Sequence, residues 1–164
     1  MITPISILSN SPAETAQIAQ IISGFCQFGH IIMLDGELGT GKTHFVKSFA
    51  EAVGSSDLVT SPTFTIANFY KIDKGNILHI DAYRLSGITE FRELGLSDFF
   101  AESIVLIEWG TQILEDFDDY LSISLQYVAG SNDSRQIIIT HSGQQWAGKI
   151  KAILQQISNK AEWK

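Results

Sequence analysis

Apolar residues after position 11 recur at the spacing of one helix face, which predicts an amphipathic helix. The residues on that face are Ile18, Ile21, Ile22 and Phe25. The preceding Ser11-Pro12-Ala13-Glu14 is typical of a helix start, with Ser11 as the N-cap, proline at the first helical position and Glu14 closing a capping box. After Gly29, the short apolar run His30–Leu34 predicts a strand that is buried on both faces.

A glycine-rich loop follows this strand, and helical spacing returns over Phe45–Val53 until Gly54. The stretch Thr63–Tyr70 is rich in β-branched and aromatic residues, which favour a strand. A turn over residues 73–76 then leads into the apolar run Ile77–Ile80. The two runs therefore predict an antiparallel hairpin.

The second half of the chain continues the mixed pattern of helices and strands. Thr89–Leu94 predicts a short helix, and the fully apolar Ile104–Ile107 predicts a second buried strand. Alternating apolar positions over Leu121–Tyr127 and the run Gln136–Thr140 predict two further strands. Apolar positions between Trp146 and Ile157 indicate a C-terminal amphipathic helix. The fold class is therefore α/β, with a mixed, mainly parallel sheet flanked by helices and containing an antiparallel hairpin.

Composition narrows the class of protein. A length of 164 residues predicts a single domain over residues 1–164. The net charge of −7 makes a generic nucleic-acid-coating surface an improbable function, so a polyanion would need a dedicated local site. The single cysteine, Cys26, excludes an internal disulfide. Neither a signal peptide nor an apolar run long enough for a bilayer is recognisable, so we expect a soluble cytoplasmic protein without membrane contact.

The glycine-rich loop matches the P-loop pattern G-x-x-x-x-G-K-[ST]. Its residues are Gly36, Glu37, Leu38, Gly39, Thr40, Gly41, Lys42 and Thr43. In such a loop, glycines let backbone N–H groups face phosphate oxygens at the start of a helix. Lys42 would bind the β- and γ-phosphates of a nucleotide, and the Thr43 hydroxyl would ligate Mg²⁺. The position of the motif between a buried strand and an amphipathic helix predicts a P-loop NTPase.

Two acidic residues follow apolar strands at the edge of the sheet where the P-loop is expected. Asp81 ends the run Ile77–Ile80, and Glu108 ends the run Ile104–Ile107. One such carboxylate commonly supports the metal and another the attacking water. We assign Glu108 to the magnesium side and Asp81 to the γ-phosphate side, although residue type alone leaves the opposite assignment open.

Other residues admit both a functional and a structural interpretation. Thr63, in Ser61-Pro62-Thr63, either senses the γ-phosphate or belongs to a plain turn. His79 is interpreted as a packed strand histidine rather than a metal ligand, and Arg84 as a surface ion-pairing residue rather than a transition-state group. Trp109 either stacks on a base, docks a partner or packs in the core, whereas the acidic stretch 115–119 is interpreted as a solvated loop. The absence of an Asn-Lys-x-Asp guanine-reading motif favours adenine.

Taken together, these motifs resemble the TsaE (YjeE) family of small bacterial ATPases that threonylcarbamoyladenosine (t6A) modification of tRNA requires. The resemblance covers about residues 11–140. It lies in Gly36–Thr43, Ser61–Phe64, His79–Arg84, Glu93–Gly95 and Ile107–Trp109. It implies a P-loop fold, weak hydrolysis of ATP to ADP with Mg²⁺, and action together with a TsaD–TsaB complex, so that tRNA is contacted only indirectly.

The resemblance also implies roles for individual residues. Lys42 would grip phosphate, Thr43 and Glu108 would hold Mg²⁺, and Asp81 would assist hydrolysis. Trp109 would lie beside the site, Arg135 would reach the nucleotide, and the helix start at Ser11–Glu14 would lie on the adenine side. Two alternatives stay open: a small-molecule P-loop kinase, and a nucleotide-gated scaffold without useful turnover.

Overall fold

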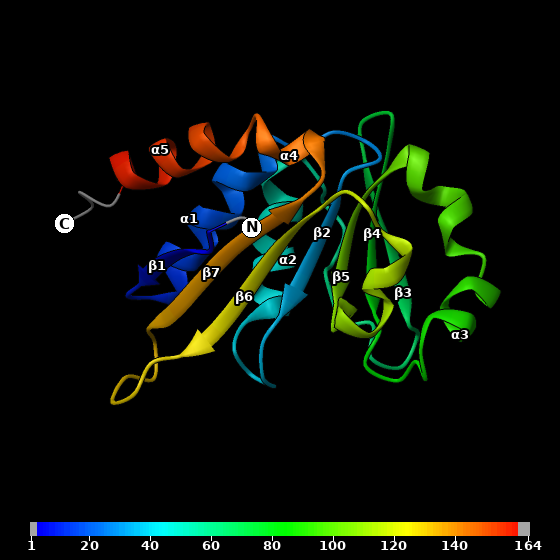
Figure 1. The fold of residues 1–164 in the computed structure, drawn as a ribbon, viewed down its shortest axis with the longest axis horizontal. Coiled ribbons are helices and arrows are strands. Elements are labelled where there is room, and N and C mark those ends of the chain that lie inside the picture. Colours follow the sequence, from blue (N-terminus) through cyan, green and yellow to red (C-terminus); the bar gives the residue numbers. More distant parts are fainter. Residues whose placement is uncertain (1–2, 161–164) are drawn as a thin grey trace.

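A seven-stranded mixed sheet forms the centre of the computed structural model, which describes residues 3–160 (Figure 1). The strand order is β1-β7-β6-β2-β5-β4-β3. The neighbouring strands β6, β2, β5 and β4 run parallel to one another, whereas the pairs β1–β7, β7–β6 and β4–β3 are antiparallel. The predicted mixed sheet is therefore confirmed. The strands are β1 (Ile5–Ser9), β2 (Ile31–Asp35), β3 (Ala67–Ile72), β4 (Gly75–Asp81), β5 (Ser103–Glu108), β6 (Tyr120–Tyr127) and β7 (Arg135–Ser142).

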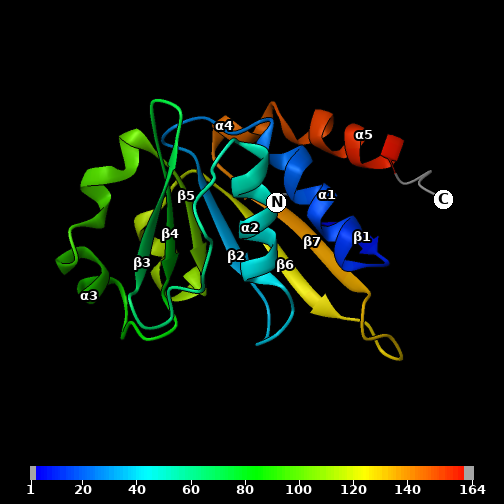
Figure 2. The ribbon, with the colours of Figure 1, turned by 180° about the vertical axis from the view of Figure 1, so that it is seen from behind.

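Helices cover the sheet on both faces, as Figures 1 and 2 show. Helices α1 (Pro12–Ser23), α2 (Lys42–Ala52) and α5 (Ile150–Lys160) pack their apolar side chains into one core. Helix α3 (Ile88–Glu93) and two 3₁₀ helices, η1 (Leu96–Glu102) and η2 (Gly110–Asp116), pack into a second core on the opposite face. A short helix, α4 (Gln144–Ala147), precedes α5.

The alternation of side chains along β4 and β5 determines which residues face α2. Ile77 belongs to the core under α2, whereas Leu78 belongs to the opposite core. Because side chains alternate with a period of two, His79 and Asp81 lie on the same face as Ile77. The same rule places Glu108 on the face of Leu106, which also belongs to the core under α2. Three polar side chains are thereby directed toward the helix that follows the P-loop.

The strand predicted over Thr63–Tyr70 begins only at Ala67. Residues 63–65 form a turn instead, closed by a hydrogen bond from Ile66 N to Pro62 O at 2.7 Å. Ile66 has a φ of +68°, a strained conformation for a β-branched residue. Contacts with the end of β4 override the β propensity of this run, since Thr63 Oγ1 donates to Asp81 Oδ2 at 2.9 Å and Ile66 O accepts from Asp81 N at 2.8 Å. The antiparallel β3–β4 hairpin itself is confirmed.

Strand β1 and the break in the C-terminal helix both depend on contacts between residues that are distant in sequence. Strand β1, which the apolar pattern does not predict, pairs antiparallel with β7. The C-terminal helix expected as one element is divided into α4 and α5 at Gly148. The Asp119 carboxylate accepts hydrogen bonds from Gln144 N and Gln145 N and fixes α4 separately, while Trp146 is fully buried.

The described residues, 3–160, contain no helix whose length and apolar character would let it cross a bilayer. Met1 and Ile2, at the start of the segment without signal-peptide character, lie outside the described residues, as do residues 161–164.

Ser11 caps α1 as predicted, since its hydroxyl accepts a hydrogen bond from Glu14 N at 3.2 Å. The Glu14 carboxylate reaches one residue further back than in a regular capping box and accepts from Asn10 N at 2.7 Å. We expect Ser11→Ala to lower the free energy of unfolding by about 1 kcal/mol, measured by urea denaturation. Ser56→Ala, at an exposed position, is the control and should change it by less than about 0.5 kcal/mol. Equal losses in both variants would contradict the capping role.

Candidate functional site

The P-loop connects β2 to α2 and is shaped by glycines with positive φ angles. Gly36 has a φ of +141°, and a Cβ at this position would overlap the carbonyl oxygen of Leu125. Gly41, the N-cap of α2, has a φ of +108° with open space around a would-be Cβ, so conformation rather than room requires glycine there. The loop therefore presents backbone at the start of a helix, the arrangement that favours binding of phosphate groups.

Lys42 is buried and its ammonium lies at the centre of the loop. The Nζ atom donates hydrogen bonds to Gly36 O at 2.6 Å and Glu37 O at 3.1 Å, and it lies 4.3 Å from the centre of the Trp109 ring. Burial lowers the pKa of Lys42 from its ordinary value, while nearby carboxylates, first among them Glu108, act in the opposite direction. The buried Lys42 ammonium would therefore attract an anionic ligand to the loop.

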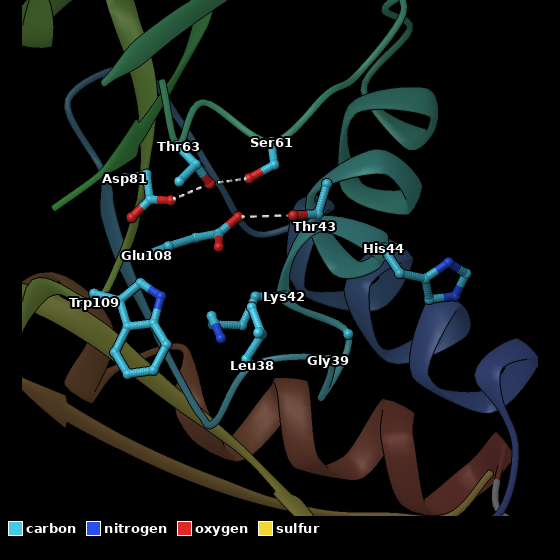
Figure 3. Close-up of a pocket in the computed structure, with 11 residues that line it drawn as sticks. Leu38, Gly39, Lys42, Thr43, His44, Ser61, Thr63, Asp81, Glu108 and Trp109 are labelled. Carbon is cyan, nitrogen blue, oxygen red and sulfur yellow. Dashed lines mark hydrogen bonds between the residues drawn. The ribbon is translucent and has the colours of Figure 1, made fainter. Parts of the chain in front are cut away.

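The two predicted carboxylates lie side by side opposite the P-loop. Asp81 and Glu108 occupy paired register positions at the ends of the parallel strands β4 and β5. Both are buried, and Figure 3 shows them across the pocket from Lys42 and Thr43. Glu108 Oε1 accepts a hydrogen bond from Thr43 Oγ1 at 3.2 Å. The structure thus brings the acid assigned to the magnesium side next to the hydroxyl assigned to the same metal.

Asp81 is held from two directions. Its Oδ2 accepts from Thr63 Oγ1 at 2.9 Å, and its Oδ1 accepts from Tyr83 N at 2.9 Å. Thr63 Oγ1 also lies 2.7 Å from Ser61 Oγ, so the loop after α2 contacts the end of β4 (Figure 3). Of the two interpretations of Thr63, the geometry favours a residue directed into the site, because Thr63 lines the pocket together with Asp81.

His79 is packed inside the strand, as predicted, but it also contacts a candidate site residue. Its side chain is fully buried, and Nε2 lies 2.8 Å from Glu108 Oε1. On the other side of the ring, Nδ1 lies 3.1 Å from the hydroxyl of Tyr70. Sequence reasoning did not identify this connection. The sequence signal that could have revealed this contact is a polar residue on a buried strand, two positions before Asp81 and therefore on the same face of the sheet.

Trp109 stands at the mouth of the pocket rather than in either core. It has a φ of +58° directly after Glu108, and its ring lies 5.2 Å from that of the exposed Tyr83. Leu38, which exposes 87% of its surface, lines the same mouth. The rest of the pocket wall comes from the P-loop, the first turn of α2, the loop 61–63 and the ends of β4 and β5.

Arg135 lies behind the P-loop, on the side of α1. Its Nε donates to Thr40 O at 2.9 Å, and its guanidinium stacks 4.8 Å from the Tyr127 ring. A second pocket on this side is lined by Pro12, Thr15, Thr40, Gly41, His44, Asp133 and Arg135. The structure therefore brings the start of α1 and Arg135 together around one pocket beside the P-loop.

Arg84 and the acidic stretch lie outside this site. Arg84 is exposed, with its guanidinium 4.6 Å from the centre of the Phe64 ring, and it does not line the pocket of Lys42. The stretch 115–119 is not simply a solvated loop: Asp116 pairs with Arg92, and Asp119 accepts from the start of α4. Neither Arg84 nor the stretch 115–119 lines the pocket that Asp81 and Glu108 line.

The donor atoms near Thr43 suit Mg²⁺ but are few. A hydroxyl and a carboxylate oxygen are the hard ligands that this ion prefers. Within residues 3–160, no group of three or more His, Cys, Asp or Glu side chains is arranged to hold a metal ion. A magnesium ion at Thr43 and Glu108 would thus depend on ligands from a bound phosphate, as is usual in P-loop sites.

Comparison with known proteins finds a family model and relatives that match most of this chain. Residues 9–137 match the family model described as threonylcarbamoyl adenosine biosynthesis protein TsaE. The chain is 36% identical to the tRNA threonylcarbamoyladenosine biosynthesis protein TsaE of Bacillus subtilis, over 83% of this chain and 85% of that protein. It is 33% identical to the protein of the same name from Streptomyces coelicolor, over 84% and 97%. The crystal structure of Bacillus subtilis YdiB superposes with a TM-score of 0.73 and 29% identity, covering 99% of both chains.

Proposed function

The chain belongs to the TsaE family of threonylcarbamoyl adenosine biosynthesis proteins, and on this premise we propose that it binds ATP with Mg²⁺ and hydrolyses it slowly. We propose further that it acts with a TsaD–TsaB complex in t6A modification of tRNA, which it contacts only through that complex. The observation that carries the proposal is the register pairing of Asp81 with Glu108 opposite a P-loop whose Thr43 contacts Glu108.

Each residue then has a role that its position supports. The P-loop amides and Lys42 bind the phosphates, and Thr43 with Glu108 would hold Mg²⁺, which would supply positive charge to the phosphoryl oxygens. Asp81 lines the same pocket, where its carboxylate accepts a hydrogen bond from Thr63. In this position it orients the attacking water and accepts its proton. Such chemistry needs positioning and charge more than covalent catalysis.

The base of the nucleotide is assigned to the side of α1. The pocket formed by the start of α1, His44 and Arg135 adjoins the P-loop at Thr40 and Gly41. Arg135 would contact the nucleotide there, and its stacking on Tyr127 fixes its direction. Trp109 closes the opposite end, beside Lys42 and the acids.

A protein partner, rather than direct tRNA binding, is supported by the surface. The net charge is −7, which opposes unassisted binding of a polyanion. Leu38 and Tyr83, which line the acidic end of the pocket, expose 87% and 63% of their surface, and Phe64, next to Thr63 in the chain, exposes 82%. Exposed apolar groups gathered at one site are typical of protein contacts. Residues 1–164 are proposed to act as one domain in this assembly.

The decisive measurement is phosphate release from ATP by the chain alone and with purified TsaD–TsaB. We expect slow release alone, a rise of at least about tenfold with the complex, and no release by Lys42→Ala under either condition. ATP-dependent association with TsaD–TsaB without any release would instead favour a nucleotide-gated scaffold. Transfer of phosphate to an added hydroxylated metabolite would favour a kinase. Failure to bind ATP and Mg²⁺ at all would refute the proposal.

A further inference from the structure

We propose that His79 is a positioning residue for Glu108, oriented by Tyr70, and that this pair ties the loop before β3 to the magnesium side of the site. The inference rests on the proposed function, because it concerns the same pocket. His79 does not line that pocket: its side chain is fully buried beneath Glu108. Its effect would therefore pass through the carboxylate that it contacts.

The contacts on the two sides of the imidazole ring hold it in one orientation. A carboxylate only accepts hydrogen bonds, so the 2.8 Å contact between His79 Nε2 and Glu108 Oε1 requires a proton on Nε2. On the other side of the ring, Nδ1 lies 3.1 Å from Tyr70 Oη, whose proton is donated to Thr60 O at 2.9 Å. Tyr70 thus holds the imidazole in the orientation in which Nε2 faces Glu108. This is the usual relation between a metal-site ligand and the groups that orient it.

Glu108 Oε1 receives two hydrogen bonds, one from His79 and one from Thr43. The first holds the carboxylate in place on the buried side, and the second comes from the side where the metal would bind. Without His79, the buried carboxylate would keep only the Thr43 contact at 3.2 Å. We expect its oxygen to be less well placed for Mg²⁺, because a ligand without a second partner can rotate.

The same chain of contacts reaches the loop that also touches Asp81. Tyr70 Oη donates to Thr60 O at 2.9 Å and accepts from Thr60 N at 3.3 Å. Three residues later, Thr63 donates to Asp81. One short segment, 60–63, is therefore connected to both acids: to Asp81 directly and to Glu108 through Tyr70 and His79.

The test compares His79→Leu and His79→Gln for the Mg²⁺ concentration that gives half-maximal ATP hydrolysis. Leucine fills space without donating, whereas the amide nitrogen of glutamine can still donate to Glu108. We expect His79→Leu to raise this concentration by at least about tenfold and His79→Gln to restore most of the loss. Affinity for ATP in the presence of a chelator should change by less than about twofold in both variants, because that binding does not use the metal.

Tyr70→Phe provides a milder variant that keeps the buried ring, and it should raise the half-saturating Mg²⁺ concentration about threefold. His30→Leu and Tyr120→Phe are the matched controls. His30 is a buried histidine with two polar contacts just before β2, away from the P-loop, and Tyr120 begins β6 at the same end of the sheet. Both controls should leave the Mg²⁺ requirement unchanged, whatever their effect on thermal unfolding.

An unchanged Mg²⁺ requirement in His79→Leu, or equal losses in the leucine and glutamine variants, would overturn the positioning role while leaving the proposed function intact. If the unsubstituted chain shows neither hydrolysis nor Mg²⁺-dependent ATP binding, the proposed function fails and this inference fails with it. The unsubstituted chain therefore distinguishes the two failures.

Discussion

Lys42→Ala is expected to weaken ATP binding by at least about a hundredfold. In the proposed complex, the ammonium would make two charge-assisted hydrogen bonds to phosphate oxygens. Each such bond contributes about 1.5–3 kcal/mol, and about 1.4 kcal/mol corresponds to a factor of ten in affinity. Isothermal titration calorimetry with ATP and Mg²⁺ measures the change directly.

The matched control is Lys47→Ala, which removes the same charge from an exposed position on the same helix and should change affinity less than about threefold. In the free protein, the Lys42 ammonium contacts the loop carbonyls of Gly36 and Glu37 and the ring of Trp109. Thermal unfolding without nucleotide should thus remain cooperative in Lys42→Ala. Affinity for ATP equal to that of the unsubstituted chain would mean that the phosphates do not lie in this loop.

The sequence predicted most of the elements because their signals are local. A period of 3.6 or 2 in apolar residues depends only on neighbours in the chain, and so do the continuous apolar runs that end at Asp81 and Glu108. Pairings between distant segments gave no such signal. Strand β1 is defined by β7, and the break between α4 and α5 is supported by Asp119, some 25 residues earlier in the chain.

The same difference between local and long-range signals applies to the residues of the candidate site. The P-loop is a contiguous motif, and the two acids could be placed because parallel strands end at the same edge of a sheet. The position of Thr63 against Asp81 depends on the turn at Ile66, which opposes local β propensity. The contact of His79 with Glu108 crosses 29 residues and depends on the register of β4 with β5, which apolar periodicity does not determine.

Glu108→Gln is expected to reduce ATP hydrolysis by at least about a hundredfold while leaving ATP bound. Glutamine has nearly the same shape, and its side-chain oxygen can still accept from Thr43 and His79, but it lacks the charge that holds Mg²⁺. Removing a carboxylate next to the phosphates also removes repulsion. In the presence of a chelator, ATP should therefore bind Glu108→Gln at least as tightly as the unsubstituted chain. Single-turnover phosphate release and calorimetry provide the two measurements.

Asp81→Asn is the informative comparison, because it separates the two acids that residue type alone could not assign. It should lose hydrolysis by a factor of about 10²–10⁴ as a water-orienting base does, yet keep the gain in ATP affinity that Mg²⁺ provides. Glu108→Gln should lose that gain. The reverse result would exchange the two roles, which the register pairing allows because both carboxylates stand at the same level of the sheet. Hydrolysis at the unsubstituted rate in both variants would exclude this pair of carboxylates from the reaction altogether, since within residues 3–160 they are the acids that line the pocket of Lys42.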